Sequence, residues 1–176
     1  MTQSAAERER DFTKLYSESF DYIYAFLLSR TAGDKRLTEE IAQDTFAAAW
    51  LSFDRFQRES SFQTWVCAIA RNKLNESYRK AIRREKREFV FKEEPAERAD
   101  GFDLEEAVLS RETGREVLRA LQSLSPSYRY ALILKYVDGF SVKEIAGVMG
   151  RTAKAVDGVL QRAKAAFERA YLQAER

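Results

Sequence analysis

Hydrogen-bonding side chains recur at helical spacing near the end of the sequence, at Lys154, Asp157, Gln161 and Arg162. Residues three and four positions apart lie on one face of a helix, so these side chains share a face. Their types pair with phosphates and with base edges in the major groove of DNA. The spacing therefore predicts a polar helix face suited to recognition chemistry.

Capping signals place this helix in a helix-turn-helix. Ser141 with Glu144 forms a capping box, Gly150 suits a left-handed helix end, and Thr152 caps the following helix. The residues expected to face inward are Ile145, Ala146, Val148, Met149, Val156, Leu160, Ala163 and Phe167. A helix-turn-helix places the start of its second helix in the major groove. The alternative interpretation is an αα-corner in a plain helical bundle.

Groups that carry catalysis are sparse. The sequence has no histidine and a single cysteine, Cys67, which excludes Cys/His zinc sites and nucleophilic dyads built on histidine. No Gly-rich loop precedes a Lys-Ser/Thr pair, as a phosphate-cradling loop requires. A carboxylate-only metal site stays formally open, but we expect no enzyme activity, no metal and no cofactor. Cys67 lies in an apolar stripe and is predicted to be a buried structural thiol.

Start and stop signals predict an all-α chain. A first helix over 6–31 ends before Gly33, a second begins with Thr38 as its N-cap, and a third begins with a Ser60–Gln63 capping box and continues to about Glu88. A later helix starts at Ser125–Pro126 and ends at Asp138–Gly139. No alternating strand pattern is present.

The charges separate along the chain although the net charge is only +2. Residues 71–92 contain nine basic and three acidic residues, 93–112 contain eight acidic and two basic, and 151–176 contain six basic and three acidic. Two basic segments around an acidic one indicate two polyanion-binding modules. We predict small helical domains over 1–90 and 105–176, joined by a flexible acidic linker over 91–104.

No apolar run approaches the roughly 18 residues of a membrane span, and the first residues lack the pattern of a signal peptide. We therefore expect a cytoplasmic protein without membrane insertion.

Three segments resemble one family. Residues 124–164, LSPSYRYALILKYVDGFSVKEIAGVMGRTAKAVDGVLQRAK, resemble region 4 of the extracytoplasmic-function (ECF) sigma factors of bacterial RNA polymerase. Residues 38–50, TEEIAQDTFAAAW, are similar to region 2.2, and 56–80, FQRESSFQTWVCAIARNKLNESYRK, are similar to regions 2.3 and 2.4. The resemblance implies a region 2 helical bundle and a region 4 helix-turn-helix. It also implies a transcription initiation factor that binds core polymerase, recognises the −10 and −35 promoter elements and promotes duplex opening.

The resemblance implies roles for residues of the first domain. Those on the second helix would bind core polymerase at the β′ coiled coil: Glu40, Gln43, Asp44, Phe46 and Trp50. The loop before the third helix and the outer face of that helix would read the −10 element through Gln57, Arg58, Ser60, Ser61, Phe62, Arg71, Asn72, Asn75, Arg79 and Lys80. Trp65 is expected in the core rather than in contact with a base.

The −35 element would be read through Lys154, Asp157, Gln161 and Arg162, with Arg151 and Thr152 on phosphates. Here the sequence departs from the family pattern. Asp157 and Gly158 stand where a basic residue and a serine are frequent, and Val159 stands where arginine is frequent. We expect weaker phosphate anchoring and an unusual −35 preference.

The expected partners are core RNA polymerase, through its β′ coiled coil and β flap, promoter DNA and an anti-sigma factor. The alternative function is a helix-turn-helix transcription regulator that acts independently of core polymerase. The motifs over 38–80 argue against that alternative.

Overall fold

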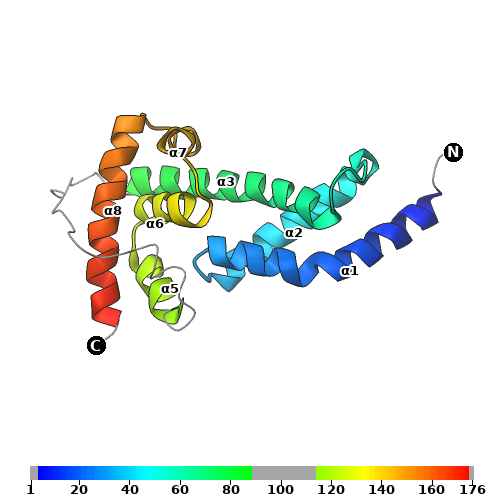
Figure 1. Cartoon of the computed structure of the whole chain (residues 1–176), viewed down its shortest axis with the longest axis horizontal. Helices are drawn as coiled ribbons and strands as arrows, with labels where there is room; N and C mark the ends of the chain where they lie inside the picture. The colour runs from blue at the N-terminus through cyan, green and yellow to red at the C-terminus, as the bar shows by residue number, and fades with distance from the viewer. Residues whose placement is uncertain (1–3, 89–113, 175–176) are drawn as a thin grey trace. The chain divides into compact units, whose positions relative to one another are not determined.

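The computed structural model describes residues 4–88 and 114–174. These residues form helices and no strand, which confirms the all-α prediction (Figure 1). Among them, none of the helices combines the length and the apolar character needed to cross a membrane. The predicted linker over 91–104 lies outside the described residues.

Internal contacts divide the chain into two compact units, Met1–Asn75 and Glu76–Arg176. The division falls inside helix α3 (Phe62–Glu88), so each unit contains part of that helix. The predicted limits of the two domains, 1–90 and 105–176, and of the linker, 91–104, stay predictions.

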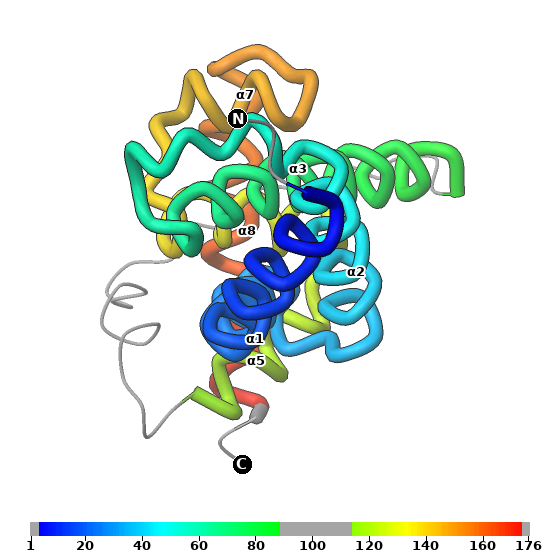
Figure 2. The backbone as a smooth tube through the Cα atoms, turned by 90° about the vertical axis from the view of Figure 1, so that its right-hand side faces the viewer, coloured from blue at the N-terminus to red at the C-terminus, as the bar shows by residue number. Residues whose placement is uncertain are grey.

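The first unit begins with a helical hairpin. Helix α1 (Ala5–Arg30) starts at a capping box between Ser4 and Glu7. The chain then reverses through Gly33, whose φ is +77°, and continues as α2 (Lys35–Leu51), which packs against α1 (Figures 1 and 2).

The N-cap predicted for α2 was wrong. Asp34 caps the helix, because its side chain accepts a hydrogen bond from the Leu37 amide at 3.0 Å. Thr38 lies within the helix and is fully buried. Its hydroxyl donates to the Asp34 carbonyl at 2.6 Å and pairs with the Thr31 hydroxyl at 2.7 Å. Thr38 therefore ties the hairpin together from inside.

The capping box predicted between Ser60 and Gln63 was wrong, because the first turn of α3 is capped by Ser61. The helix begins at Phe62, and Ser61 Oγ accepts a hydrogen bond from the Thr64 amide at 3.1 Å. Ser60 instead donates to the Ser61 carbonyl at 3.3 Å. The helix reaches Glu88, the last described residue before position 114.

Aromatic packing around Phe12 holds the first unit together. Its ring meets the rings of Trp50, Phe53 and Phe62 edge-on, with centroid distances of 5.1, 5.2 and 5.8 Å. Phe53 belongs to a short 3₁₀ turn, η1 (Phe53–Arg55), between α2 and α3. Edge-to-face aromatic pairs contribute about 0.5–1.5 kcal/mol each beyond the area they bury. Phe12 thus joins α1, the end of α2, η1 and the start of α3.

The second unit is built around α8 (Ala153–Ala174), which packs against three other helices. These are α5 (Gly114–Ser123), α6 (Pro126–Leu132) and α7 (Val142–Met149). A π-helical turn, η2 (Ile133–Val137), continues α6 as far as Asp138. Phe167 of α8 is fully buried in this core.

The last turns of α3 also belong to the second unit. Tyr78 stacks on Tyr130 with ring centroids 4.2 Å apart. Pro126 starts α6 as predicted, but Ser125 makes no side-chain cap. The Glu85 carboxylate caps this helix instead, accepting hydrogen bonds from the Ser127 amide at 2.9 Å and the Ser127 hydroxyl at 2.5 Å. A carboxylate is favourable at a helix N-terminus because of the helix dipole.

Two glycines near the end of α7 provide a matched test of this fold. Gly150 has φ +63°, which costs an L-residue about 1–2 kcal/mol, whereas Gly147 is helical with open space around it. We expect Gly150→Ala to destabilise the second unit by about 1 kcal/mol. Gly147→Ala should stabilise it by about 0.5–1 kcal/mol. Thermal unfolding of the full chain measures both, and equal shifts in the same direction would contradict the helix end assigned to Gly150.

Candidate nucleic-acid and partner interfaces

The helix-turn-helix forms as its capping signals predicted. The Ser141 amide and hydroxyl donate to one Glu144 carboxylate oxygen at 2.8 and 2.7 Å, and the Glu144 amide donates to Ser141 Oγ at 3.3 Å. These bonds, the hydroxyl bond foremost, lower the pKa of Glu144. Gly150 adopts the left-handed conformation that ends α7. Thr152 Oγ1 accepts from the Ala155 amide at 3.2 Å and caps α8, completing the corner seen in Figure 2.

The faces of the two helices agree with the predicted pattern. The predicted inward residues of α7 and α8, from Ile145 to Phe167, are all buried. Lys154, Asp157 and Gln161 are exposed, whereas Arg151 and Arg162 are half-buried. The motif therefore presents a narrow polar strip at the start of α8.

Val159 was wrongly counted as a missing cation on that strip. It is 1% exposed and belongs to the core between α8 and its neighbours. An arginine there could not reach solvent without disturbing the packing. The Arg162 guanidinium instead lies over Gly158, where an added Cβ would sit 3.4 Å from its nearest nitrogen. The positive charge of the strip is thus provided by Lys154 and by Arg162, which lies one turn after Gly158.

The predicted −10 loop is exposed at the start of α3. Gln57, Arg58, Ser60 and Ser61 are all exposed, and Arg58 has a positive φ of 58°. Its guanidinium pairs with the Asp11 carboxylate at 3.3 Å. Phe62 does not belong to this surface, because it is 5% exposed and packs beneath the loop.

Polar side chains continue along α3. Arg71, Asn72, Arg79 and Lys80 are exposed and Asn75 is half-buried. Arg79 Nε donates to the Val148 carbonyl at 3.2 Å within the second unit.

Trp65 lies between the predicted alternatives. It is half-buried, with its ring centroid 5.1 Å from that of Phe56 and 5.8 Å from that of Phe62. It packs at the edge of the aromatic core, next to the loop.

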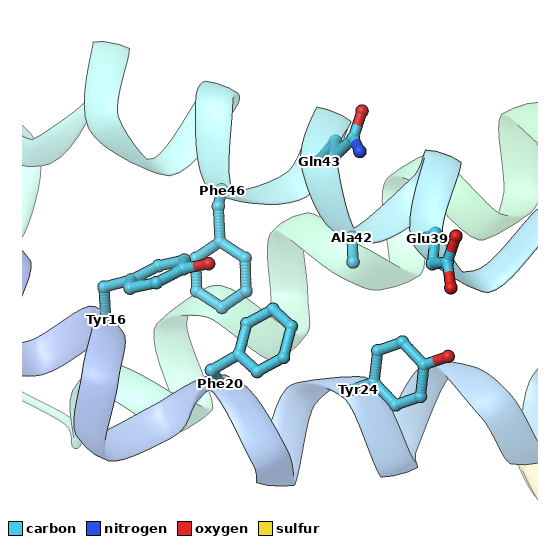
Figure 3. Close-up of a pocket in the computed structure, with 7 residues that line it drawn as sticks. All are labelled: Tyr16, Phe20, Tyr24, Glu39, Ala42, Gln43 and Phe46. Carbon is cyan, nitrogen blue, oxygen red and sulfur yellow. The ribbon is translucent and has the colours of Figure 1, made fainter.

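A groove of about 230 Å³ runs between α1 and α2 in the first unit. Figure 3 shows three rings of α1, Tyr16, Phe20 and Tyr24, facing Ala42 and Phe46 of α2, with Gln43 and Glu39 beside them. Gln43 and Phe46 were predicted to bind core polymerase, and Phe46 is 7% exposed at the floor of the groove. The α1 rings were missed in the sequence, because their i, i+4 spacing also fits a buried stripe.

The remaining predicted residues of α2 do not line this groove. Glu40 and Asp44 are exposed, and Trp50 is half-buried. The Arg8 guanidinium covers the Trp50 ring at 4.1 Å and donates to the Trp50 carbonyl at 2.7 Å. Trp50 therefore contributes mainly to packing between α1 and α2.

Cys67 is half-buried rather than fully buried. Burial raises the pKa of its thiol, against a smaller lowering effect of the Arg30 and Arg71 charges. Over residues 4–88 and 114–174, no group of three or more His, Cys, Asp or Glu side chains is arranged to hold a metal ion.

Comparisons with known proteins match both units. The family model "Sigma-70 region 2" matches residues 15–85, and "Sigma-70, region 4" matches residues 114–167. The RNA polymerase sigma factor CnrH of Cupriavidus metallidurans is 33% identical over 138 residues, which cover 72% of this chain and 69% of CnrH. The ECF RNA polymerase sigma factor SigW of Bacillus subtilis is 29% identical over 159 residues, covering 85% of this chain and 82% of SigW.

A solved structure of the sigma factor RpoE with the anti-sigma factor NepR from Bartonella quintana is 24% identical, covers 95% of this chain and 99% of that one, and has a TM-score of 0.47.

Two helical units, the second with a helix-turn-helix, define a DNA-binding class of protein. The matches to both sigma regions and to CnrH narrow the class: the chain belongs to the ECF sigma factors of the sigma-70 family.

The Ser141–Glu144 box makes a pH-dependent contribution to the helix-turn-helix. Because the pKa of Glu144 is lowered in the folded chain, its contribution is present above the ordinary glutamate pKa and is lost as the pH falls through the lowered value. Ser141→Ala removes the N-cap hydroxyl and should destabilise α7 by about 1 kcal/mol at neutral pH. Amide hydrogen exchange of α7, measured at about pH 7 and pH 3, checks this prediction. The difference in exchange rate between Ser141→Ala and the parent chain should be smaller at pH 3 than at pH 7. A difference that grows in acid would contradict this assignment.

Proposed function

We propose that this sigma factor divides promoter recognition between two surfaces. One surface, made by α2, the loop before α3 and α3 itself, binds core RNA polymerase and the −10 element, and the other, at the start of α8, binds the −35 element. Membership of the ECF family makes the chain a polymerase-associated transcription initiation factor. The observation that carries the division is the pair of polar surfaces, one on α3 and its preceding loop and one at the start of α8.

The core-binding surface is α2 and the groove beside it. Gln43 lines an apolar groove, and Glu40 and Asp44 are exposed on the same helix, which suits a partner with basic and apolar side chains. By the family resemblance, that partner is the β′ coiled coil, while the β flap is the partner of the second unit.

The −10 element is held as a single strand. The exposed loop residues Gln57, Arg58, Ser60 and Ser61 capture an unstacked base above a rigid aromatic floor that contains Phe62. Arg71, Asn72, Asn75, Arg79 and Lys80 then follow the strand along α3, where cations bind phosphates and amides bind base edges.

The −35 element is read in the major groove by the start of α8. Lys154, Asp157, Gln161 and Arg162 face the bases, and Arg151 and Thr152 contact phosphates. Asp157 accepts a hydrogen bond from a cytosine amino group, a contact that gives a distinct −35 preference.

Reconstitution tests this proposal as a whole. The purified chain, mixed with core polymerase and a library of randomised promoters, should yield transcripts from promoters that share two separated elements. Binding to duplex DNA without core, and no transcription with it, would favour the independent regulator, which the matches to both sigma regions do not support.

We also propose that the chain is not itself an enzyme and acts in the cytoplasm, where polymerase and DNA lie. RNA synthesis without added core would contradict the first of these statements, and recovery outside the cytoplasmic fraction would contradict the second.

An anti-sigma factor is a further proposed partner, as NepR is for RpoE of Bartonella quintana. Affinity purification from the native cell under non-inducing conditions tests it. Recovery of polymerase alone would count against sequestration.

Charge reversal on α2 should weaken assembly with core polymerase. Asp44→Arg places a cation opposite a basic partner, so we expect at least about tenfold weaker binding, or roughly 1.4 kcal/mol. Glu18→Arg makes the same change at an exposed α1 position that does not line the groove. Fluorescence titration with labelled core measures both, and equal losses would remove α2 from the core-binding surface.

Replacement of Asp157 should change the −35 preference at one base pair. Asp157→Ala loses the acceptor, and discrimination at that pair should fall by about 1–3 kcal/mol. Glu168→Ala, about three turns further along α8, is the matched control. Selection of promoters bound by each holoenzyme measures the preference, and an unchanged −35 consensus would exclude Asp157 from base reading.

A further inference from the structure

The first turns of α1 contact the chain on both sides of the −10 loop, residues 57–61. Arg8 is half-buried, and its Nε donates to the Asp54 carboxylate of η1 at 2.8 Å. Its Nη2 donates to the Trp50 carbonyl at 2.7 Å, and its guanidinium carbon lies 4.1 Å from the centroid of the Trp50 ring. One cation therefore holds the end of α2 and the turn that follows it.

The chemistry of these contacts suits a fixed arrangement. The last carbonyls of a helix lack partners within the helix, and the helix dipole makes that end negative, so a guanidinium is favourable there. Hydrogen bonds from a charged donor are stronger than neutral ones, and the face of the Trp50 ring adds a cation–π contact. The Arg8 side chain is only 24% exposed, whereas that of Asp54 is 77% exposed. The guanidinium is thus anchored on Trp50 and reaches outward to Asp54.

The next turn of α1 reaches the loop itself. The Asp11 carboxylate accepts a hydrogen bond from Arg58 Nη2 at 3.3 Å. Phe12 packs edge-on against Phe62, the first residue of α3, with ring centroids 5.8 Å apart. Arg8, Asp11 and Phe12 are spaced i, i+3 and i+4, so they share one face of α1. That face contacts residues just before the loop, a residue within it and the residue that follows it.

A loop that captures a base binds more tightly when its bound conformation is already formed. Arg58 has a φ of +58°, a left-handed conformation that is unfavourable for a residue with a long side chain and persists where surrounding contacts hold it. Its side chain is exposed, and the contact with Asp11 ties it to a helix. Ordering a loop at the moment of binding costs conformational entropy, and a loop ordered in advance avoids that cost.

The family match does not include this face of α1. Arg8 and Asp11 precede the segment that matches the region 2 model, which begins at residue 15. No local sequence pattern marks them either, because their partners lie 42 to 47 positions further along the chain.

We propose that Arg8 and Asp11 are positioning residues for −10 recognition, which hold the −10 loop in the conformation that captures an unstacked base. Arg8 fixes the end of α2 and η1, from which the loop departs, and Asp11 fixes Arg58 within the loop. Neither residue touches the DNA. This inference rests on the proposed function of the loop, and it adds the first turns of α1 to the elements that determine promoter specificity.

The test uses holoenzyme made from the full chain and core polymerase. A promoter is first selected with the parent holoenzyme from randomised DNA, and failure at this step would contradict the proposed function rather than the positioning role. Two fluorescent single strands are then compared: the non-template strand of the selected −10 element and a scrambled strand of the same length and composition. Anisotropy titrations over a range of salt concentrations give the discrimination ratio, which is the affinity for the selected strand divided by that for the scrambled strand.

Arg8→Gln should reduce the discrimination ratio roughly tenfold, because the loop must then be ordered at the moment of binding. Since no phosphate contact is removed, the slope of log K against log salt for the selected strand should be unchanged. A residue that bound a phosphate directly would lower that slope by about 0.7. A discrimination ratio equal to that of the parent, or a fall of this size in the slope, would overturn the positioning role of Arg8.

Neighbouring residues of α1 provide matched controls. Arg10→Gln is the control for Arg8, because Arg10 is an exposed arginine bonded to the Ala6 carbonyl of its own helix. Asp11→Asn should also reduce the discrimination ratio, and Glu9→Gln removes the charge of an exposed carboxylate without changing it. Loss of a charge affects both strands alike, whereas a misplaced loop weakens binding of the selected strand alone. Equal ratios in Asp11→Asn and Glu9→Gln would overturn the role of Asp11, and an equal fall in Arg10→Gln would overturn that of Arg8.

A general loss of stability would weaken binding of core and of both strands together and would leave the discrimination ratio unchanged. Asp54→Asn alters an exposed side chain, so this variant should fold as the parent does. It should reduce the ratio by less than Arg8→Gln, and the double variant should behave like Arg8→Gln alone, because both changes break one interaction. Losses that add in the double variant would contradict the path from Arg8 through Asp54 to the loop.

Arg8→Lys provides the conservative variant. It should recover part of the discrimination ratio lost in Arg8→Gln, because lysine keeps the charge without the planar fork. If Arg8→Gln does not fold, Arg8→Lys and Asp54→Asn decide the question by themselves. Ratios equal to that of the parent in both variants would overturn the proposal.

Discussion

The edge-on packing of Phe12 against Trp50, Phe53 and Phe62 joins four consecutive elements, and the surfaces of the first unit depend on it. Burying these rings fixes the start of α3, so the polar residues just before it form a loop above an apolar floor. Further along α1 and earlier in α2, the same hairpin forms the groove lined by Phe20 and Phe46. One packing arrangement thus presents a polar loop and an apolar groove on the same small unit.

In the second unit, a single helix must both build the core and face the DNA. Val156, Val159, Leu160 and Ala163 of α8 are buried, which leaves few positions for recognition. Because a helix has 3.6 residues per turn, the outer strip is narrow. Because Val159 belongs to the core, it does not count as a missing positive charge on this strip. The strip therefore lacks fewer cations than the comparison with the family pattern had indicated. Asp157 and Gly158 are the remaining departures from the family pattern, and our proposal gives Asp157 a role in reading a base.

Local signals were reliable where the residues that make them are close in sequence. The box between Ser141 and Glu144, the helix end at Gly150 and the inward faces of α7 and α8 were predicted and confirmed. The cap of α2 was mistaken because Asp34 and Thr38 are both good N-cap residues, and only the burial of Thr38 against Thr31 decides between them. Phe62 was assigned to the −10 loop by the family resemblance, and the structure shows its ring packed edge-on against Phe12.

The sequence by itself determined the helical class, the order of the two sigma regions and the types of side chain available for recognition. The helical period, the caps and the local excess of one charge each depend on residues that are close together in the sequence. Only the tertiary structure decided which distant residues meet: Arg8 on Trp50, Glu85 as the cap of α6, and Phe12 on Phe62. Each of these contacts joins residues from different helices. The packing of whole helix faces brings these residues together, and no local sequence pattern encodes that packing.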